Sequence, residues 1–216
     1  MDTKTLNETF ALAYQNHQKN NLDIAKNLYE KVLNIDPNHF KTVFLLGSLL
    51  TQNKNFNLAK KLLKKANQID PNHLLTLNNL GLVYYELGEF QKALGCYEKA
   101  IKIEKNNAPI YNNLGNTLKE LGKINEAIRC YERAIQINTN YLAAHSNLGK
   151  ILGENNNIYE AKKHYEKALN LNPNLKEACD GYGRLLLKLN QHNKALAYIR
   201  KGSGCIRFTE KNFKII

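Results

Sequence analysis

The segment NNLGNTLKELGKINEAIRCYERAIQIN, residues 112–138, decides the fold of this 216-residue chain. Its apolar side chains recur at helical spacing in two successive sets. The first set runs from Leu114 to Leu121, and the second runs from Ile124 to Ile135, directly after Gly122. A glycine at this place takes the left-handed backbone conformation that commonly ends a helix. The segment therefore predicts two helices joined by a tight turn.

The same pattern recurs along the chain at a fixed interval, the one that separates Gly81 from Gly115. We call a set of residues that recur at this interval a column. Three columns consist mainly of small side chains: Ala13, Gly47, Gly81, Gly115, Gly149 and Gly183; Ala25, Ala59, Ala93, Ala127, Ala161 and Ala195; and Ala66, Ala100, Ala134 and Ala168, with Val32 and Gly202 at the ends. Small residues at fixed positions let paired helices approach closely, so each interval predicts one helix pair stacked on the next. We call the two helices of a repeat helix A and helix B.

Six repeats follow from this phase, and Pro37, Pro71 and Pro173 end three of the helices B. The six repeats are expected at residues 6–39, 40–73, 74–107, 108–141, 142–175 and 176–209. Two columns of large side chains are expected to fill the core: Leu12, Leu46, Leu80, Leu114 and Leu148 in helix A, and Tyr29, Leu63, Tyr97, Tyr131, Tyr165 and Ile199 in helix B. The fold class is therefore all-α, an α-solenoid treated as one elongated domain.

The last residues depart from the repeat. After the array, assigned to residues 1–204, a tail at 205–216 alternates Ile206 and Phe208 with Arg207 and Thr209, which is typical of a strand. Such an end predicts either that the tail folds back on the last repeat or that the chain is the N-terminal part of a longer protein.

The composition excludes several classes of protein. Hydrophobic residues make up 43% of the chain, but no apolar stretch is long enough to span a membrane. The N-terminal residues lack the features of a secretory signal, so a cytoplasmic location is expected. Four cysteines without paired spacing, Cys96, Cys130, Cys179 and Cys205, are interpreted as reduced packing residues.

No motif for catalysis, metal binding or phosphate binding is present. His39 and His73 share one loop position of the repeat, whereas His145, His164 and His192 fall in different phases. We therefore expect no enzyme activity, no metal and no cofactor.

The repeating unit, with Leu-Gly in helix A, Ala and Tyr in helix B and Pro at the exit, resembles the tetratricopeptide repeat, whose length of about 34 residues it shares. The resemblance covers about nine tenths of the chain. The middle repeats, NNLGNTLKELGKINEAIRCYERAIQIN and HSNLGKIL, are similar to those beside the catalytic domain of O-GlcNAc transferases. The resemblance implies a right-handed superhelix whose concave groove, lined by helices A, holds peptides of partner proteins.

Applied to this chain, the family pattern implies which side chains line the groove. Its first repeats would be aromatic and its middle repeats rich in amides: Phe10, Tyr14, Phe44 and Tyr85, then Asn78, Asn112, Asn116, Lys119 and Lys150. Asn79, Asn113 and Asn147 match the asparagine ladder that grips a peptide backbone in transferase-type repeats. An amide offers both a donor and an acceptor, so such a ladder would bind without selecting the peptide sequence. Alternatively, these amides bridge neighbouring helices within the solenoid.

The net charge of +12 raises the question of nucleic acid. The groove positions carry equal numbers of acidic and basic residues, while the basic surplus lies mainly on helices B, which argues against nucleic acid in the groove. Three roles follow: a scaffold or adaptor that binds a peptide in the groove; a substrate-recruiting region of a longer enzyme such as a glycosyltransferase or oxygenase; and weak binding of nucleic acid or an acidic partner by the convex face. The sequence does not determine the oligomeric state.

Overall fold

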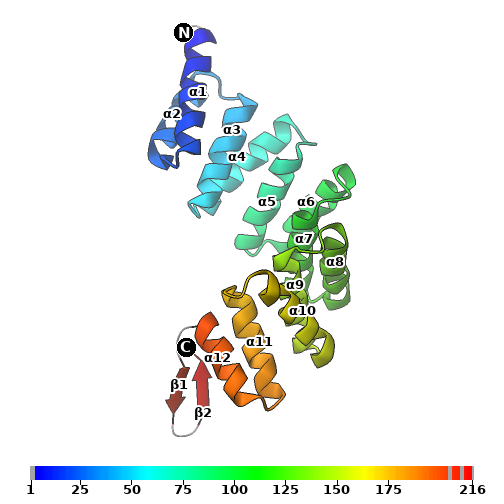
Figure 1. Cartoon of the computed structure of the whole chain (residues 1–216). Helices are drawn as coiled ribbons and strands as arrows, with labels where there is room; N and C mark the ends of the chain where they lie inside the picture. Colours follow the sequence, from blue (N-terminus) through cyan, green and yellow to red (C-terminus); the bar gives the residue numbers. More distant parts are fainter. Residues whose placement is uncertain (1–2, 204–205, 210–211, 216) are drawn as a thin grey trace. The chain divides into compact units, whose positions relative to one another are not determined.

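The computed structural model describes residues 3–203, 206–209 and 212–215. Over these residues the chain forms a succession of helix pairs and two short strands (Figure 1). It divides into two compact parts, an N-terminal half, Met1–Lys105, and a C-terminal half, Asn106–Ile216. Each half is described by itself.

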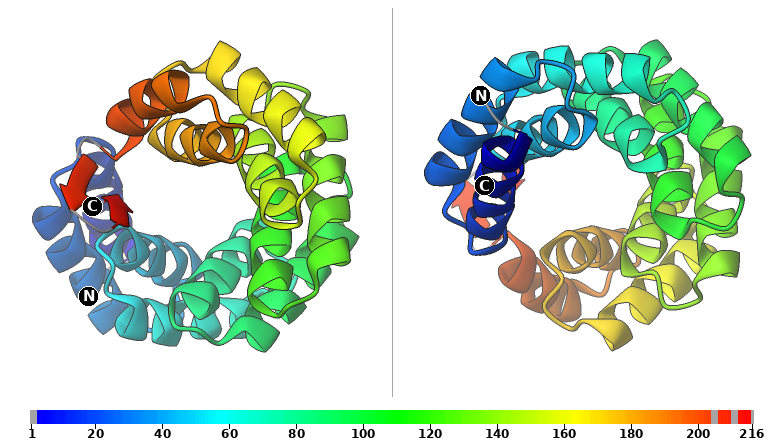
Figure 2. Two further views of the ribbon diagram at one scale, coloured as in Figure 1. Left: turned by 90° about the horizontal axis from the view of Figure 1, so that it is seen from below. Right: turned by 90° about the horizontal axis from the view of Figure 1, so that it is seen from above.

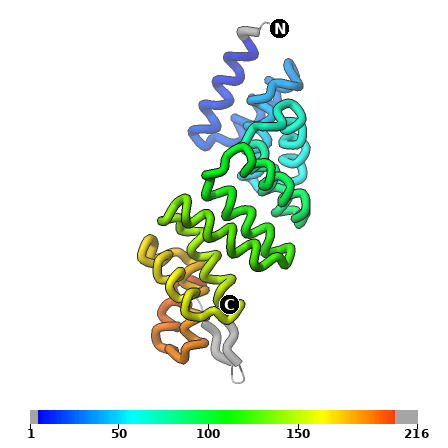
Figure 3. The backbone as a smooth tube through the Cα atoms, turned by 90° about the vertical axis from the view of Figure 1, so that its right-hand side faces the viewer, coloured from blue at the N-terminus to red at the C-terminus, as the bar shows by residue number. Residues whose placement is uncertain are grey.

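The N-terminal half contains three helix pairs. They are α1 (Thr3–Gln18) with α2 (Leu22–Ile35), α3 (Phe40–Gln52) with α4 (Phe56–Ile69), and α5 (Leu74–Glu86) with α6 (Phe90–Ile103). Each helix A is followed by its helix B after a short turn, as the backbone tube in Figure 3 shows. The second helix of one pair packs on the first helix of the next, α2 on α3 and α4 on α5.

The C-terminal half repeats this arrangement and adds a hairpin. Its pairs are α7 (Ala108–Glu120) with α8 (Ile124–Ile137), α9 (Leu142–Glu154) with α10 (Ile158–Leu171), and α11 (Lys176–Lys188) with α12 (His192–Gly202). The strands β1 (Ile206–Thr209) and β2 (Asn212–Ile215) pair antiparallel, with Thr209 opposite Asn212. The strand predicted from the alternation after residue 205 is thus confirmed, while Cys205 itself lies outside the described residues.

Within each half the two helices of a repeat lie side by side and form two rows (Figure 2). Helices A of neighbouring repeats touch each other, α3 with α5 in the N-terminal half and α7 with α9 and α9 with α11 in the C-terminal half. The predicted groove residues all belong to helices A.

The predicted core columns are buried with a single exception. The six alanines of the second column have no exposed surface, and the large column of helix B is at most 3% exposed. A Cβ added at Gly115 would lie 2.6 Å from a ring carbon of Tyr131, and one at Gly81 would lie 2.7 Å from the ring of Tyr97. The glycine of helix A therefore makes room for the aromatic ring of helix B in the same repeat.

Leu12 is the exception. It was expected in the core with the other leucines of its column, yet it is 49% exposed, whereas Leu46, Leu80, Leu114 and Leu148 are at most 5% exposed. Within each half a helix B packs against the helix A that follows it, α2 on α3 and α4 on α5 in the N-terminal half, and among the described residues no helix precedes α1. Periodicity assigns Leu12 to the correct face of its helix but does not tell whether that face is covered.

The cysteines behave as packing residues. Cys96 and Cys179 are buried, Cys130 is half-buried, and all three are free thiols. Burial raises the pKa of the Cys96 and Cys130 thiols to about 11. Since the thiolate is the reactive form, neither thiol is activated for chemistry.

Each repeat makes its tight turn with one residue in the left-handed region. Gly122 has a φ of 74°, as predicted, and Gly88, one repeat earlier, has a φ of 72°. The equivalent residues in the other repeats are Asn20, Lys54, Asn156 and Asn190, with φ between 57° and 64°. Asparagine tolerates this conformation better than lysine does, so Lys54 is the strained member of the set.

Replacing Lys54 by glycine is therefore expected to stabilise the N-terminal half by about 1 kcal/mol, because the left-handed conformation carries no Cβ penalty in glycine. Chemical denaturation followed by circular dichroism measures the change. Lys64 is exposed in the interior of α4, and the matched variant Lys64→Gly is expected to destabilise by about the same amount. A destabilising effect of Lys54→Gly would show that the lysine side chain contributes more than its backbone strain costs.

Candidate functional site

The N-terminal half carries an aromatic pocket on the free face of its helices A. It encloses about 400 Å³ and is lined by Phe10 and Tyr14 of α1, by Phe40, Lys41, Phe44 and Leu45 of α3, and by His73 at the start of α5. Phe10, Tyr14 and Phe44 were expected in the groove from the sequence. Phe40, Leu45 and His73 were not expected there; Phe40 is the first residue of α3, and His73 precedes α5.

Ring contacts hold the pocket in shape. The Phe10 and Tyr14 rings stack at 6.4 Å, as do those of Phe40 and Phe44, and the His73 ring meets Phe44 edge-on at 4.8 Å. Tyr14 remains 44% exposed. A concave apolar surface with one exposed aromatic ring and a lysine at its rim can accept an apolar side chain of a ligand.

Tyr85 does not belong to this pocket. Its ring meets Phe90 of α6 in a T-shaped contact at 5.5 Å. The expected aromatic groove is therefore assembled by α1, α3 and the start of α5, and Tyr85 lies outside that set of lining residues.

The turn histidines have a structural role. His39 and His73 each precede a helix A, and their Nδ1 atoms lie 2.6 Å and 2.8 Å from the hydroxyls of Thr42 and Thr76. His73 Nδ1 also accepts a hydrogen bond from the backbone N–H of Thr76, so it caps α5. The contact that the two histidines share is the one with the threonine hydroxyl three residues later.

Two asparagines of the predicted ladder, Asn79 and Asn147, form hydrogen bonds between neighbouring helices A. Asn79 Nδ2 donates to Ser48 Oγ at 2.9 Å in the N-terminal half. In the C-terminal half, Asn147 Nδ2 donates to Asn112 Oδ1 at 2.9 Å and to Asn116 Oδ1 at 3.1 Å. These bridges are the alternative that the sequence left open for the ladder positions.

Other predicted amide and lysine positions also engage the protein. Asn112 is only 5% exposed, so it lies beneath the surface instead of lining it. Asn116 Oδ1 accepts a second hydrogen bond, at 2.8 Å, from the Tyr131 hydroxyl. Asn78 Nδ2 lies 3.4 Å from Asn79 Oδ1, and Lys119 Nζ pairs with Glu120 at 3.1 Å.

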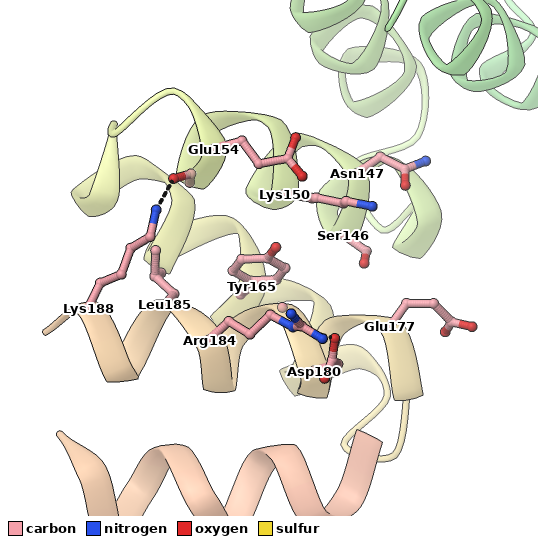
Figure 4. Close-up of a pocket in the computed structure, with 12 residues that line it drawn as sticks. Ser146, Asn147, Lys150, Glu154, Tyr165, Glu177, Asp180, Arg184, Leu185 and Lys188 are labelled. Atoms are coloured by element: carbon pink, nitrogen blue, oxygen red, sulfur yellow. Dashed lines mark hydrogen bonds and ion pairs between the residues drawn. The ribbon is translucent and has the colours of Figure 1, made fainter. Parts of the chain in front are cut away.

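The C-terminal half holds a larger, polar pocket of about 650 Å³ between α9 and α11 (Figure 4). It is lined by Ser146, Asn147, Lys150, Gly153 and Glu154 of α9, by Glu177, Asp180, Gly181, Arg184, Leu185 and Lys188 of α11, and by Tyr165 of α10. Lys150 and Asn147 were predicted groove residues. Tyr165 was assigned to the core column alone, and only the tertiary structure shows that it also lines a pocket.

Internal contacts fix part of this polar lining. Arg184 Nε donates to Asp180 Oδ2 at 2.9 Å, and Asp180 Oδ1 accepts from the Ser203 hydroxyl at 2.6 Å. Lys188 Nζ donates to the Gly153 carbonyl at 3.0 Å, near the C-terminal end of α9. With three acidic and three basic side chains, the lining has no net charge, in keeping with the balance expected for the groove.

His145 and His164 occupy different positions of the repeat, yet their side chains are in contact. His145 Nδ1 and His164 Nδ1 lie 3.0 Å apart, and His145 Nε2 lies 3.1 Å from the Thr139 carbonyl. Since a carbonyl only accepts, His145 Nε2 carries the proton and its Nδ1 accepts from His164 Nδ1–H. Burial lowers the pKa of both imidazoles, and the neighbouring histidine lowers that of His164 further.

Acidification is therefore expected to destabilise the C-terminal half. Below pH of about 6.5 these histidines take up protons in the unfolded chain before they do so in the folded one, so the free energy of unfolding falls as pH decreases toward their folded pKa values. Denaturation at several pH values between neutral and mildly acidic measures the slope. In the variant His164→Gln the slope is expected to be smaller, and an unchanged slope would contradict this role of the pair.

Neither a metal-binding group nor a membrane-spanning helix is found among the described residues. Within 3–203 and the two strands, no group of three His, Cys, Asp or Glu side chains is placed to hold a metal ion. No helix in the part of the chain that the structure describes is both long and apolar enough to cross a membrane.

Comparison with protein families identifies the repeats. A model of the TPR repeat matches residues 81–122 and 115–156, and the tetratricopeptide repeat model matches 143–175. A model described as anaphase-promoting complex, cyclosome, subunit 3 matches 18–100. No curated protein matches the chain.

Solved structures share the fold. MamA is 26% identical with a TM-score of 0.63, covering 73% of this chain and 92% of its own. PilW, a type IV pilus biogenesis factor, is 16% identical with a TM-score of 0.81 and covers 93% of both chains. YrrB, described as a TPR protein with an unusual peptide-binding site, is 20% identical with a TM-score of 0.61, covering 82% of this chain and 91% of its own. The described residues form six helix pairs in one phase, and models of the repeat match residues 81–175, so the chain belongs to the tetratricopeptide-repeat family.

Proposed function

We propose that this chain is a scaffold or adaptor module whose helices A hold an extended peptide segment of a partner protein. The observation that carries the proposal is the aromatic pocket of the N-terminal half, where four aromatic rings and a leucine line a concave surface of about 400 Å³. Concave apolar surfaces with a few polar groups are typical of binding sites. The peptide-binding site named for YrrB supports a similar use of the fold.

The asparagines at 79, 113 and 147 would contact the peptide backbone in this proposal. Asn147 uses its Nδ2 for the bridge to α7, and its Oδ1 has no partner among the described residues. That oxygen is available to accept from a peptide N–H, and the bridge holds the amide in the required orientation. The same side chain can therefore link two helices and bind a ligand.

Selection of binding peptides from a random displayed library tests the proposal. Selected peptides are expected to carry an apolar side chain and to lose about tenfold in affinity when Tyr14 is replaced by alanine, because aromatic anchors dominate such interfaces. Tyr159, which is 80% exposed and lies on α10, provides the matched control Tyr159→Ala with unchanged affinity. Equal affinity of the wild type and Tyr14→Ala for every selected peptide would contradict the pocket.

The asparagine ladder needs a separate variant. Alanine at Asn79, Asn113 and Asn147 together is expected to weaken binding of the selected peptides, with circular dichroism confirming that the helices are retained. Wild-type affinity in this triple variant would remove the ladder from the proposal while leaving the aromatic pocket in place.

A further inference from the structure

The hydroxyl of Tyr165 opens into the polar pocket of the C-terminal half without a partner. The side chain is 3% exposed, and among the described residues its Oη makes no hydrogen bond. One repeat earlier, the equivalent hydroxyl of Tyr131 donates to Asn116 Oδ1 at 2.8 Å. The residue equivalent to Asn116 is Lys150, whose ammonium group has no acceptor to offer.

The surroundings keep this hydroxyl accessible from the pocket. A Cβ at Gly181 would overlap Tyr165 Oη, so the glycine makes room for the hydroxyl at the pocket wall. Figure 4 shows the ring between Glu154 and Lys150 on one side and Arg184 on the other. The hydroxyl can therefore form a hydrogen bond with a ligand that enters the pocket.

The unpaired charges of the pocket are mainly negative. Asp180 is bound to Arg184 and Ser203, and Lys188 is bound to the end of α9. Within residues 3–203, neither Glu154 nor Glu177 forms an ion pair, and Lys150 forms none either. Two carboxylates and a single ammonium group therefore remain for a ligand.

The electrostatic potential at the Tyr165 hydroxyl is also negative. Burial is the main cause that raises the pKa of Tyr165, Glu154 and Asp180 raise it further, and Arg184 opposes them with a smaller effect. The phenol therefore stays protonated, and the nearby charges create a negative potential at its oxygen. A cation placed there is attracted, whereas a carboxylate or phosphate is repelled.

We propose that this pocket binds the guanidinium group of an arginine side chain in the groove-bound peptide, with Tyr165 Oη accepting one N–H and Glu154 balancing the charge. A guanidinium group has five N–H donors in a plane, enough to engage a hydroxyl and a carboxylate together. Glu177, in the first turn of α11, provides a second carboxylate for the same ligand. The proposal rests on peptide binding in the groove and adds the side chain that the C-terminal half selects.

Titration of isotope-labelled protein with N-acetyl-arginine amide, followed by the backbone amide signals of Gly153, Gly181 and Arg184, tests the pocket directly. We expect saturable shifts with a Kd in the millimolar range, as befits a ligand of this size. N-acetyl-glutamine amide and N-acetyl-glutamate amide are expected to give no saturable shift. Equal or larger shifts with the glutamate compound, or none with the arginine compound, would overturn the proposal.

Matched variants assign the effect to the hydroxyl. Tyr165→Phe keeps the ring in the core and is expected to raise the Kd about tenfold, as is Glu154→Gln on the exposed face of α9. Tyr131→Phe removes the equivalent hydroxyl one repeat earlier and is expected to leave the Kd unchanged. An unchanged Kd in both Tyr165→Phe and Glu154→Gln would refute the assignment.

The titration contains no peptide, so its outcome separates the two proposals. Arginine binding in a chain from which no peptide can be selected would retain the pocket and refute the peptide-binding function. Selected peptides that bind without arginine, together with no response to N-acetyl-arginine amide, would refute only the pocket.

Discussion

Replacing Tyr131 by alanine is expected to lower the free energy of unfolding of the C-terminal half by about 3–5 kcal/mol, the usual cost of removing a buried aromatic ring. Tyr131 is 1% exposed, its ring fills the space beside Gly115, and its hydroxyl bonds to Asn116. The substitution leaves a cavity and also removes that hydrogen bond. Because repeats are stabilised by their neighbours, the loss should extend to the adjoining helices.

Denaturant unfolding followed by circular dichroism measures this loss. Tyr159→Ala serves as the control, since this ring is 80% exposed and its removal is expected to change stability by less than about 0.5 kcal/mol. Tyr131→Phe should fall between the two, because it removes only the hydroxyl. Similar stabilities for Tyr131→Ala and Tyr159→Ala would contradict the packing described for this repeat.

The second large effect is expected at Gly115. Its Cβ in the variant Gly115→Ala would lie 2.6 Å from Tyr131 Cε1, and the buried ring cannot move aside without breaking its hydrogen bond to Asn116. Overpacking of this kind costs about 1–3 kcal/mol. The variant is therefore expected to be destabilised although alanine is the better helix former.

Gly95 supplies the opposite case for comparison. It lies within α6, and a Cβ added there would meet nothing within 4 Å. Gly95→Ala is expected to stabilise the N-terminal half by about 0.5–1 kcal/mol through helix propensity alone. Thermal or chemical unfolding of the two variants compares them, and a stabilising Gly115→Ala would show that the helices are not in close contact at the glycine column.

The repeat period predicts the core because packing in an array depends on the helical phase of each residue. Gly115 and Tyr131 belong to the same repeat and meet within one helix pair, so their contact recurs wherever the pair recurs. The left-handed turns at Gly88 and Gly122 are equally local. The exposed face of Leu12 departs from the pattern because its burial requires a neighbouring helix.

The candidate site was predicted in outline but not in its hydrogen bonds. The resemblance to the tetratricopeptide repeat implied that Phe10, Tyr14 and Phe44 line one groove, and the structure places all three around a pocket. The position of Asn147 was predicted in the same way, yet its partners, Asn112 and Asn116, lie on the preceding helix A. Which donor meets which acceptor depends on the side chain present in the adjacent repeat.

The array of helix pairs and nearly all of its buried columns can be derived from a pattern that recurs at a fixed interval along the chain. The pairing of His145 with His164 and the unpartnered hydroxyl of Tyr165 became visible only in three dimensions. Periodicity fixes the direction in which a side chain points, whereas hydrogen bonding and charge depend on the particular residues that meet there. Those residues differ between repeats, and the differences distinguish the pockets of the two halves.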